Sequence, residues 1–194
     1  KQRLLRAAAQ MDMIYYQEVD RATVSELQQF VLFQKGKSKS RRIKHFMHQY
    51  DLARQTDFYL FDFRFARHDE PKKQTVFWCL SDQLNLPWFY MEPQKITHTL
   101  EKFLGKKEIS FEIYPSFDRN YWVEVTDESA VRYLFNEDFL DFFNREPGWC
   151  MEGFRNQFVL YRYRKRTRPE ECPRFLEMGK KVFDLLLKRG TSTL

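Results

Sequence analysis

Aromatic side chains recur at every second position in residues 58–65, which is the period of an extended chain. Four rings fall on one face, at Tyr59, Phe61, Phe63 and Phe65. The other face carries Phe58, Leu60, Asp62 and Arg64. A helix would scatter these rings around its axis, whereas a strand collects them on one side. The sequence therefore predicts a β-strand here, and a sheet at the centre of the fold.

The aromatic content of the whole chain supports the same interpretation. The 194 residues include 20 Phe, 10 Tyr and 4 Trp, and aromatic residues favour strands. Each ring can bury about 150–250 Å², so nearly all of the rings are expected in the core. A chain of this length can bury roughly 70% of its unfolded surface without disulfides or metals. We interpret residues 1–194 as a single globular domain, with residues 1–20 as a candidate helical N-terminal tether.

The remaining segments predict hairpin-linked strands with helices between them. The expected strands cover 43–50, 74–80, 86–91, 109–113, 120–125, 149–152 and 157–164. The expected helices cover 2–12, 94–103, a segment capped by Thr126, 136–143 and 170–188. The polar residues 68–73 include Pro71 and predict a hairpin loop. Because no long crossovers appear, we expect the α+β class: a mainly antiparallel sheet with helices packed on one face and the C-terminal helix covering the sheet.

No motif for catalysis or cofactor binding is present in the sequence. The six glycines are too far apart to build a phosphate-cradling loop, and no nucleophile elbow occurs. His45 and His48 could share a helix face, but no adjacent carboxylate or cysteine completes a metal site. We expect no catalytic residue, no cofactor and no metal. An enzyme whose site is assembled from scattered residues stays an alternative.

The three cysteines, Cys79, Cys150 and Cys172, are far apart and odd in number. This pattern favours a reducing compartment over a secreted disulfide framework. No apolar stretch reaches the ~20 residues that cross a bilayer. Since the sequence begins at Lys1, we expect a fragment whose upstream part could include a membrane anchor.

Several carboxylates lie among apolar neighbours. Asp62 and Arg64 are two apart, so a strand would project both from one face, most simply as a charge pair. Four glutamates are also flanked by apolar residues, at Glu92, Glu112, Glu124 and Glu152. Sequence spacing alone does not join any two of them into an acid–base pair.

Two basic runs, with six cations in residues 35–44 and five in residues 162–168, contain no acidic residue and give the only partner signal in a chain of formal net charge +6. The candidate polyanion-binding residues are Lys35, Lys37, Lys39, Arg41, Arg42, Lys44, Arg162, Arg164, Lys165 and Arg166. Such runs attract nucleic acid or anionic lipid. Tyr161 and Tyr163 could stack on single-stranded bases. In a strand, however, they face away from Arg162 and Arg164, which is also typical of an ordinary half-buried strand.

A series of aromatic and structural motifs runs through the chain. They are 61–65, 74–76, 86–89, 92–93, Phe117, Tyr121, 131–132, 134–135, Trp149, 152–153 and 160–162. This series resembles an uncharacterised bacterial family whose aromatic-rich domain often follows predicted transmembrane helices. The resemblance covers roughly residues 27–188, with Phe63 and Phe65 where the family would have Tyr. It implies a cytosolic face and a membrane tether, and it implies no activity, cofactor or catalytic residue.

Three functional hypotheses follow. The first is a non-enzymatic binding or interaction domain, as the cytosolic part of a membrane-anchored bacterial protein, whose partner is an anionic membrane surface or another protein. The second is a nucleic-acid-binding domain that uses the two basic runs. The third is an enzyme whose site the sequence does not reveal.

Overall fold

The computed structural model describes residues 1–67, 70–94 and 106–188, and these form one nine-stranded sheet. The strands are β1 (Ile14–Tyr16), β2 (Arg42–Asp51), β3 (Thr56–Arg67), β4 (Glu70–Leu80), β5 (Leu86–Pro93), β6 (Lys107–Ile109), β7 (Tyr121–Val125), β8 (Cys150–Arg155) and β9 (Gln157–Tyr161). Their order across the sheet is β1-β2-β3-β4-β9-β8-β5-β7-β6. Every neighbouring pair is antiparallel. The hairpin β8–β9 therefore lies between β4 and β5.

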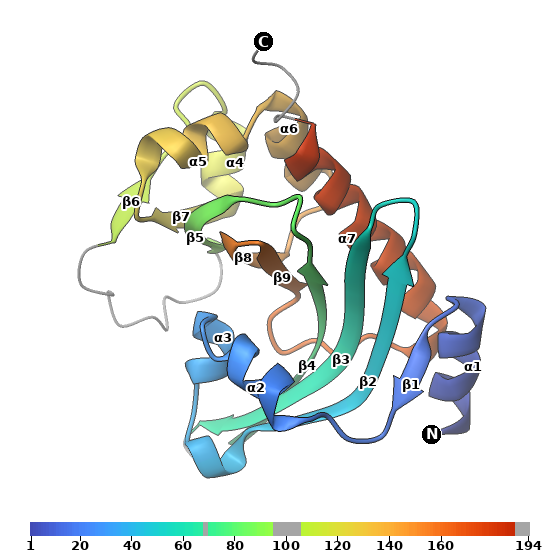
Figure 1. Ribbon diagram of the computed structural model, residues 1–194. Coiled ribbons are helices and arrows are strands. Elements are labelled where there is room, and N and C mark those ends of the chain that lie inside the picture. Colours follow the sequence, from blue (N-terminus) through green and yellow to red (C-terminus); the bar gives the residue numbers. More distant parts are fainter. Residues whose placement is uncertain (68–69, 95–105, 189–194) are drawn as a thin grey trace.

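Helices lie on both faces of this sheet (Figure 1). They are α1 (Gln2–Gln10), α2 (Arg21–Leu27), α3 (Val31–Gln34), α4 (Pro115–Asn120), α5 (Glu128–Leu134), α6 (Glu137–Arg145) and α7 (Cys172–Leu187). The predicted C-terminal helix, α7, shares its core with α1 and with α4 to α6. The short helices α2 and α3 pack on the opposite face of the sheet, where the sequence did not predict helices. The α+β class and the antiparallel sheet with its C-terminal helix are thus confirmed.

The alternation in β3 divides the interior into two cores. Phe58 and Leu60 join the large cluster on the α7 side, while Phe61, Phe63 and Phe65 join the cluster beneath α2 and α3. All five side chains are at most 2% exposed. The period-two pattern therefore identified the strand and also which residues share each core.

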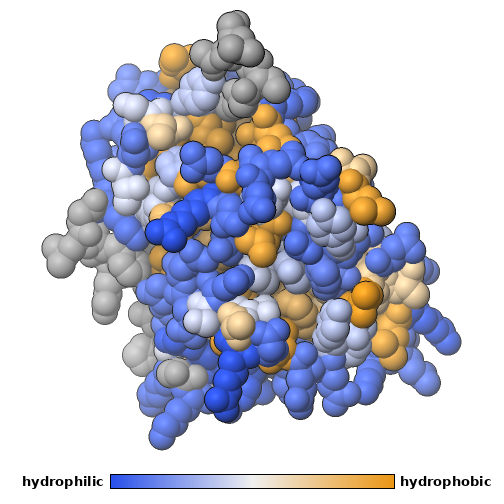
Figure 2. Space-filling model, in the orientation of Figure 1, coloured by the Kyte–Doolittle hydropathy of each residue, from blue (hydrophilic) through white to orange (hydrophobic). Residues whose placement is uncertain are grey.

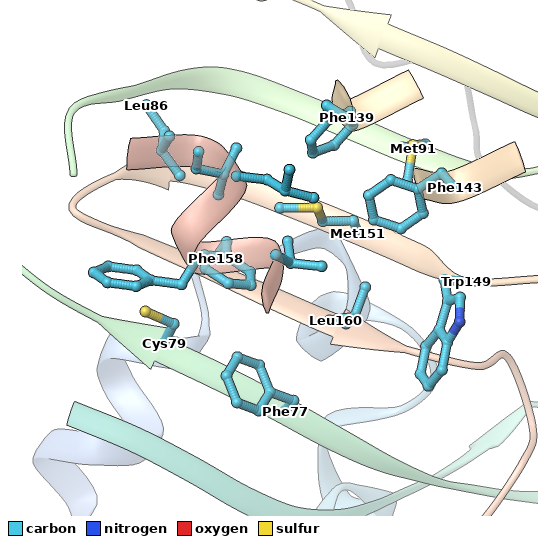
Figure 3. Packing of buried hydrophobic residues seen from close by; sticks show 14 of the residues in the cluster. Phe77, Cys79, Leu86, Met91, Phe139, Phe143, Trp149, Met151, Phe158 and Leu160 are labelled. Carbon is cyan, nitrogen blue, oxygen red and sulfur yellow. The ribbon is translucent and has the colours of Figure 1, made fainter. Parts of the chain in front are cut away.

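The packing of α7 depends on a glycine. A Cβ at Gly179 would lie only 2.3 Å from a ring atom of Phe77 on β4, so the helix backbone sits directly against that ring. Figure 3 shows Phe77 beside Leu160 and Phe158 of the next strand, within the same cluster. A small residue at this position lets α7 approach the sheet closely.

The hairpin between β3 and β4 is longer than the sequence predicts. We expected a loop at 68–73, but β4 begins at Glu70, and Pro71 is the register partner of Ala66. Proline is tolerated there because β4 pairs with β9 only from Val76 onward, which leaves this part of β4 as an edge. The loop prediction is therefore wrong for residues 70–73.

Smaller differences occur at the other end of the sheet. The strand expected at 109–113 ends at Ile109, and the six-residue helix α4 was not predicted. The cap expected at Thr126 is supplied by Asp127, whose carboxylate accepts a hydrogen bond from the Ala130 amide. The helix expected over 94–103 lies outside the described residues. Among the described residues, no helix combines the length and apolar character that a bilayer crossing requires.

Candidate functional site

A cavity of about 610 Å³ opens at the edge of the sheet where β2 extends beyond β1. β1 pairs only with residues 46–48 of β2, so the first residues of β2 border open space instead of a strand. A bulge between Lys44 and Met47, with His45 at a positive φ of 57°, turns the strand at this point. We call this cavity the basic groove.

The basic groove combines cationic and apolar walls. Its cationic side chains are Lys1, Arg41, Arg42 and Lys44, and Glu18 is its carboxylate. Its apolar walls are Val19, Val24, Phe33, Ile43 and Phe63. Phe33 and Phe63 lie with ring centroids 4.6 Å apart and belong to the core beneath α2 and α3. The groove therefore suits a molecule with an anionic group attached to an apolar part.

The cations of the first run have different structural tasks. Arg41 donates to the carbonyls of Gln34, Lys35 and Gly36, which are left unpaired where α3 ends. Arg42 donates to the carbonyls of Lys39 and Arg41. These two guanidinium groups therefore shape the groove wall as well as charging it.

The other lysines of this run differ in exposure. The Lys35 ammonium lies 3.4 Å from the Tyr90 hydroxyl and 5.3 Å from the Tyr163 ring centroid, so it points inward over the sheet. Lys37, Lys39 and Lys44 are exposed. Of these three, Lys44 lines the groove. Figure 2, which has the orientation of Figure 1, shows hydrophilic side chains over most of the visible surface. They include its lower part, where the segment before β2 lies in Figure 1.

Part of the second basic run lies near the basic groove, and the rest lies on other parts of the surface. Arg166 makes an ion pair with Asp62 at 2.5 Å, and Asp62 is the register partner of Lys44. The Asp62 carboxylate also accepts from Thr75, so it pairs with these groups rather than with Arg64 as expected. The two runs are thus neighbours.

The rest of the second run points elsewhere. The Arg164 guanidinium carbon lies 4.8 Å from the Tyr163 ring centroid, and Lys165 is exposed. The Arg162 guanidinium lies over Trp149, on the α7 side of the sheet. Tyr161 is fully buried. Its hydroxyl donates to Glu152 at 3.1 Å, so this ring is not available to stack on a nucleic acid base.

The two histidines do not converge as ligands. The Nδ1 atom of His45 lies 2.9 Å from the Tyr15 hydroxyl, and burial lowers the pKa of His45. His48 pairs with Asp57 at 2.7 Å. Within the described ranges, no three histidine, cysteine or acidic side chains are placed to hold a metal ion.

Three of the four glutamates flanked by apolar residues meet inside the molecule. Glu92, Glu124 and Glu152 are each at most 4% exposed. Tyr90 on β5 is the register partner of Glu124 on β7 and of Glu152 on β8, so Tyr90, Glu124 and Glu152 form one row across the sheet, and Glu92 lies two positions along β5 from this row. The Tyr90 hydroxyl donates to Glu92 at 2.6 Å. The sequence marks each glutamate separately by its apolar neighbours, and only the strand order brings them together.

Glu152 connects this row to the basic groove. Its carboxylate accepts from the amides of Val31 at 2.5 Å and Leu32 at 3.0 Å, at the start of α3. Burial raises the pKa of Glu152, while the nearby Lys35 ammonium and these hydrogen bonds oppose the rise. The buried carboxylate thus fixes α3, and α3 leads into the segment that carries the first basic run.

The comparisons with known proteins reveal structural similarity without sequence similarity to a known family. The sequence matches no protein-family model and no curated protein. A solved structure, the mycobacterial trehalose monomycolate transport factor A (TtfA), is similar with a TM-score of 0.65 and 12% sequence identity. The match covers 95% of this chain and 94% of that one. At this identity, the likeness shows a shared fold.

Proposed function

We propose that this chain is a non-enzymatic binding domain whose basic groove holds anionic lipid headgroups at a membrane surface. The observation that carries the proposal is the combination of cationic residues and apolar walls in one cavity of about 610 Å³. Anionic lipids attract basic residues near the membrane, and an apolar wall can accommodate the first part of an acyl chain.

Other observations agree with this choice. The structural relative is named for the transport of trehalose monomycolate, which is compatible with a binding role. The family resemblance seen in the sequence implies a cytosolic face and a membrane tether, and the proposal adopts both. The nucleic-acid alternative is weakened because Tyr161 is buried and Arg162 lies over Trp149, which leaves Tyr163 as the one tyrosine of the second run that could stack on a base.

Co-sedimentation with vesicles tests the proposal. The chain should bind vesicles of phosphatidylcholine mixed with phosphatidylglycerol, and not phosphatidylcholine alone. Each basic residue near such a surface contributes about 1 kcal/mol, so Arg42→Gln with Lys44→Gln should weaken binding by about 30-fold. Arg119→Gln with Arg145→Gln is the matched control, because both are exposed cations, on α4 and α6, that do not line the groove.

The apolar wall is tested separately. Val24 lies on α2 and lines the groove, so Val24→Ser should reduce vesicle binding but leave binding of soluble glycerol phosphate unchanged. Equal binding to neutral and anionic vesicles, or equal losses for the groove and control variants, would refute the proposal. Tighter binding to an RNA oligonucleotide than to vesicles would favour the nucleic-acid alternative.

A further inference from the structure

A second cavity, of about 260 Å³, lies between the open end of the β8–β9 hairpin, at Trp149 and Arg162, and the first turns of α7. None of its lining residues lines the basic groove. We infer that this cavity binds a small oxyanion, a phosphate or carboxylate group, through Trp149 and Arg162. This site goes beyond the proposed function, since it opens on the α7 side of the sheet, where Trp149 belongs to the large core.

The first observation is a buried donor without an acceptor. Trp149 is 7% exposed, and its ring packs 4.9 Å from the Phe175 ring centroid. Its indole nitrogen is buried and makes no hydrogen bond. Figure 3 shows this nitrogen on the side of the ring away from Leu160 and the rest of the labelled cluster. Buried donors in folded proteins nearly always have a partner, so this N–H calls for an acceptor.

The second observation is the half-buried guanidinium of Arg162, whose Nε also has no acceptor. The carbon ζ of Arg162 lies 4.4 Å from the Trp149 ring centroid. Its Nε is buried and donates to no acceptor, and no carboxylate within the described part of the chain forms an ion pair with it. An arginine fork binds the two oxygens of a carboxylate or phosphate together. The indole N–H beside it provides a further donor.

The charges around the cavity favour an anion over a neutral acceptor. Lys165 lies at its rim and makes no ion pair with any residue that the structure describes, so its charge, like that of Arg162, is available to an anion. The two rim carboxylates are already engaged, since Glu146 pairs with Arg174 at 3.6 Å and Glu171 accepts from the Arg168 amide at 3.1 Å. The volume also exceeds the ~30 Å³ share of one water molecule, so the space admits a larger acceptor.

Titration followed by the indole resonances in a ¹⁵N–¹H spectrum tests this site. The chain has 4 Trp, and Trp149→Phe assigns the signal because it removes only that N–H from a similar ring. Inorganic phosphate should shift the Trp149 signal saturably, and sodium chloride of equal ionic strength should not. Acetate in place of phosphate shows whether a carboxylate also binds.

Calorimetric titration with phosphate measures how much each of two substitutions weakens binding. Arg162→Lys keeps the charge but removes the fork and should weaken binding at least about tenfold. Trp149→Phe should weaken it too, while Arg145→Gln, an exposed cation outside the cavity, should not. If Arg162→Lys does not fold, Trp149→Phe decides alone.

Two results would overturn the inference. One is a Trp149 signal unmoved by both anions at about 10 mM, where a site of Kd about 1 mM is mostly filled. The other is a contact between the indole proton and a long-lived water that phosphate does not displace, because the cavity then holds only solvent.

Discussion

Replacing Gly179 with alanine tests how closely α7 packs on the sheet. The added Cβ would lie 2.3 Å from Cε2 of Phe77 and 2.4 Å from its Cδ2 and Cζ atoms. Carbon atoms in contact lie about 3.5–4.0 Å apart, so α7 or the ring must move by more than an ångström. Phe77 is fully buried between α7 and its strand neighbours, which leaves the ring little room to move.

Two effects of opposite sign set the size of the change. Alanine is favoured over glycine inside a helix by about 1 kcal/mol. Overpacking a well-packed core costs about 1–3 kcal/mol, and occasionally more. Because three ring atoms lie inside contact distance, the overpacking cost of Gly179→Ala should be about 3 kcal/mol or more. After the helix preference for alanine is subtracted, we expect the free energy of unfolding to fall by about 2 kcal/mol. For a chain of this size, that lowers Tm by about 4–8 °C.

Urea unfolding of Gly179→Ala, Phe77→Leu and the double variant checks this reasoning. A smaller side chain opposite the new methyl should relieve the clash, so the double variant should lose less than the two single losses added together. Gly148→Ala is the control: its φ of 93° is strained for alanine, but nothing lies within 4 Å of the new Cβ. Phe77→Leu should not rescue it. If Gly179→Ala is as stable as the parent chain, then α7 does not pack against Phe77 as closely as described.

Two further predictions concern the anchoring of the first basic run. Burial raises the pKa of Glu152 above its ordinary 4.5, so the folded chain holds a proton that the unfolded chain releases. The free energy of unfolding should therefore fall as the pH rises from about 4.5 through the folded pKa, and Glu152→Gln should flatten this slope in urea melts across pH. Arg41→Ala should lower the free energy of unfolding by about 1–3 kcal/mol by freeing three carbonyls at the end of α3. Lys37→Ala, an exposed change in the same run, should stay within about 0.5 kcal/mol in the same melts.

The sequence predicted the elements in which apolar residues repeat at a regular spacing. β3 followed from alternating rings, and α7 from its stripe of Phe175, Gly179, Val182 and Leu186, all of which are buried. The continuation of β4 through Pro71 could not be predicted, because it depends on where β9 stops pairing. The six-residue helix α4 is too short to show a helical period.

That the two basic runs bind a polyanion stays a prediction. The runs were recognised from the sequence, but their proximity was not predicted, and it depends on the Arg166–Asp62 ion pair beside Lys44. Their division between the groove, the Asp62 ion pair and the Trp149 cavity depends on which carbonyls and rings the guanidinium groups meet. The meeting of Glu152 with the start of α3 joins residues about 120 apart in sequence, and no local pattern encodes such a contact.

The central position of the β8–β9 hairpin has a consequence for how the chain reaches its fold during synthesis. β4 and β5 are consecutive in sequence but are joined in the sheet only through residues 150–161. Before these residues pair, no ladder joins strands β1 to β4 with strands β5 to β7, so β4 and β5 each have an unpaired edge. Pairing across long sequence separations is slow, and open edges pair readily with other chains. A partly folded chain in which the hairpin has not docked therefore exposes β4 and β5 as edges that can pair with other chains.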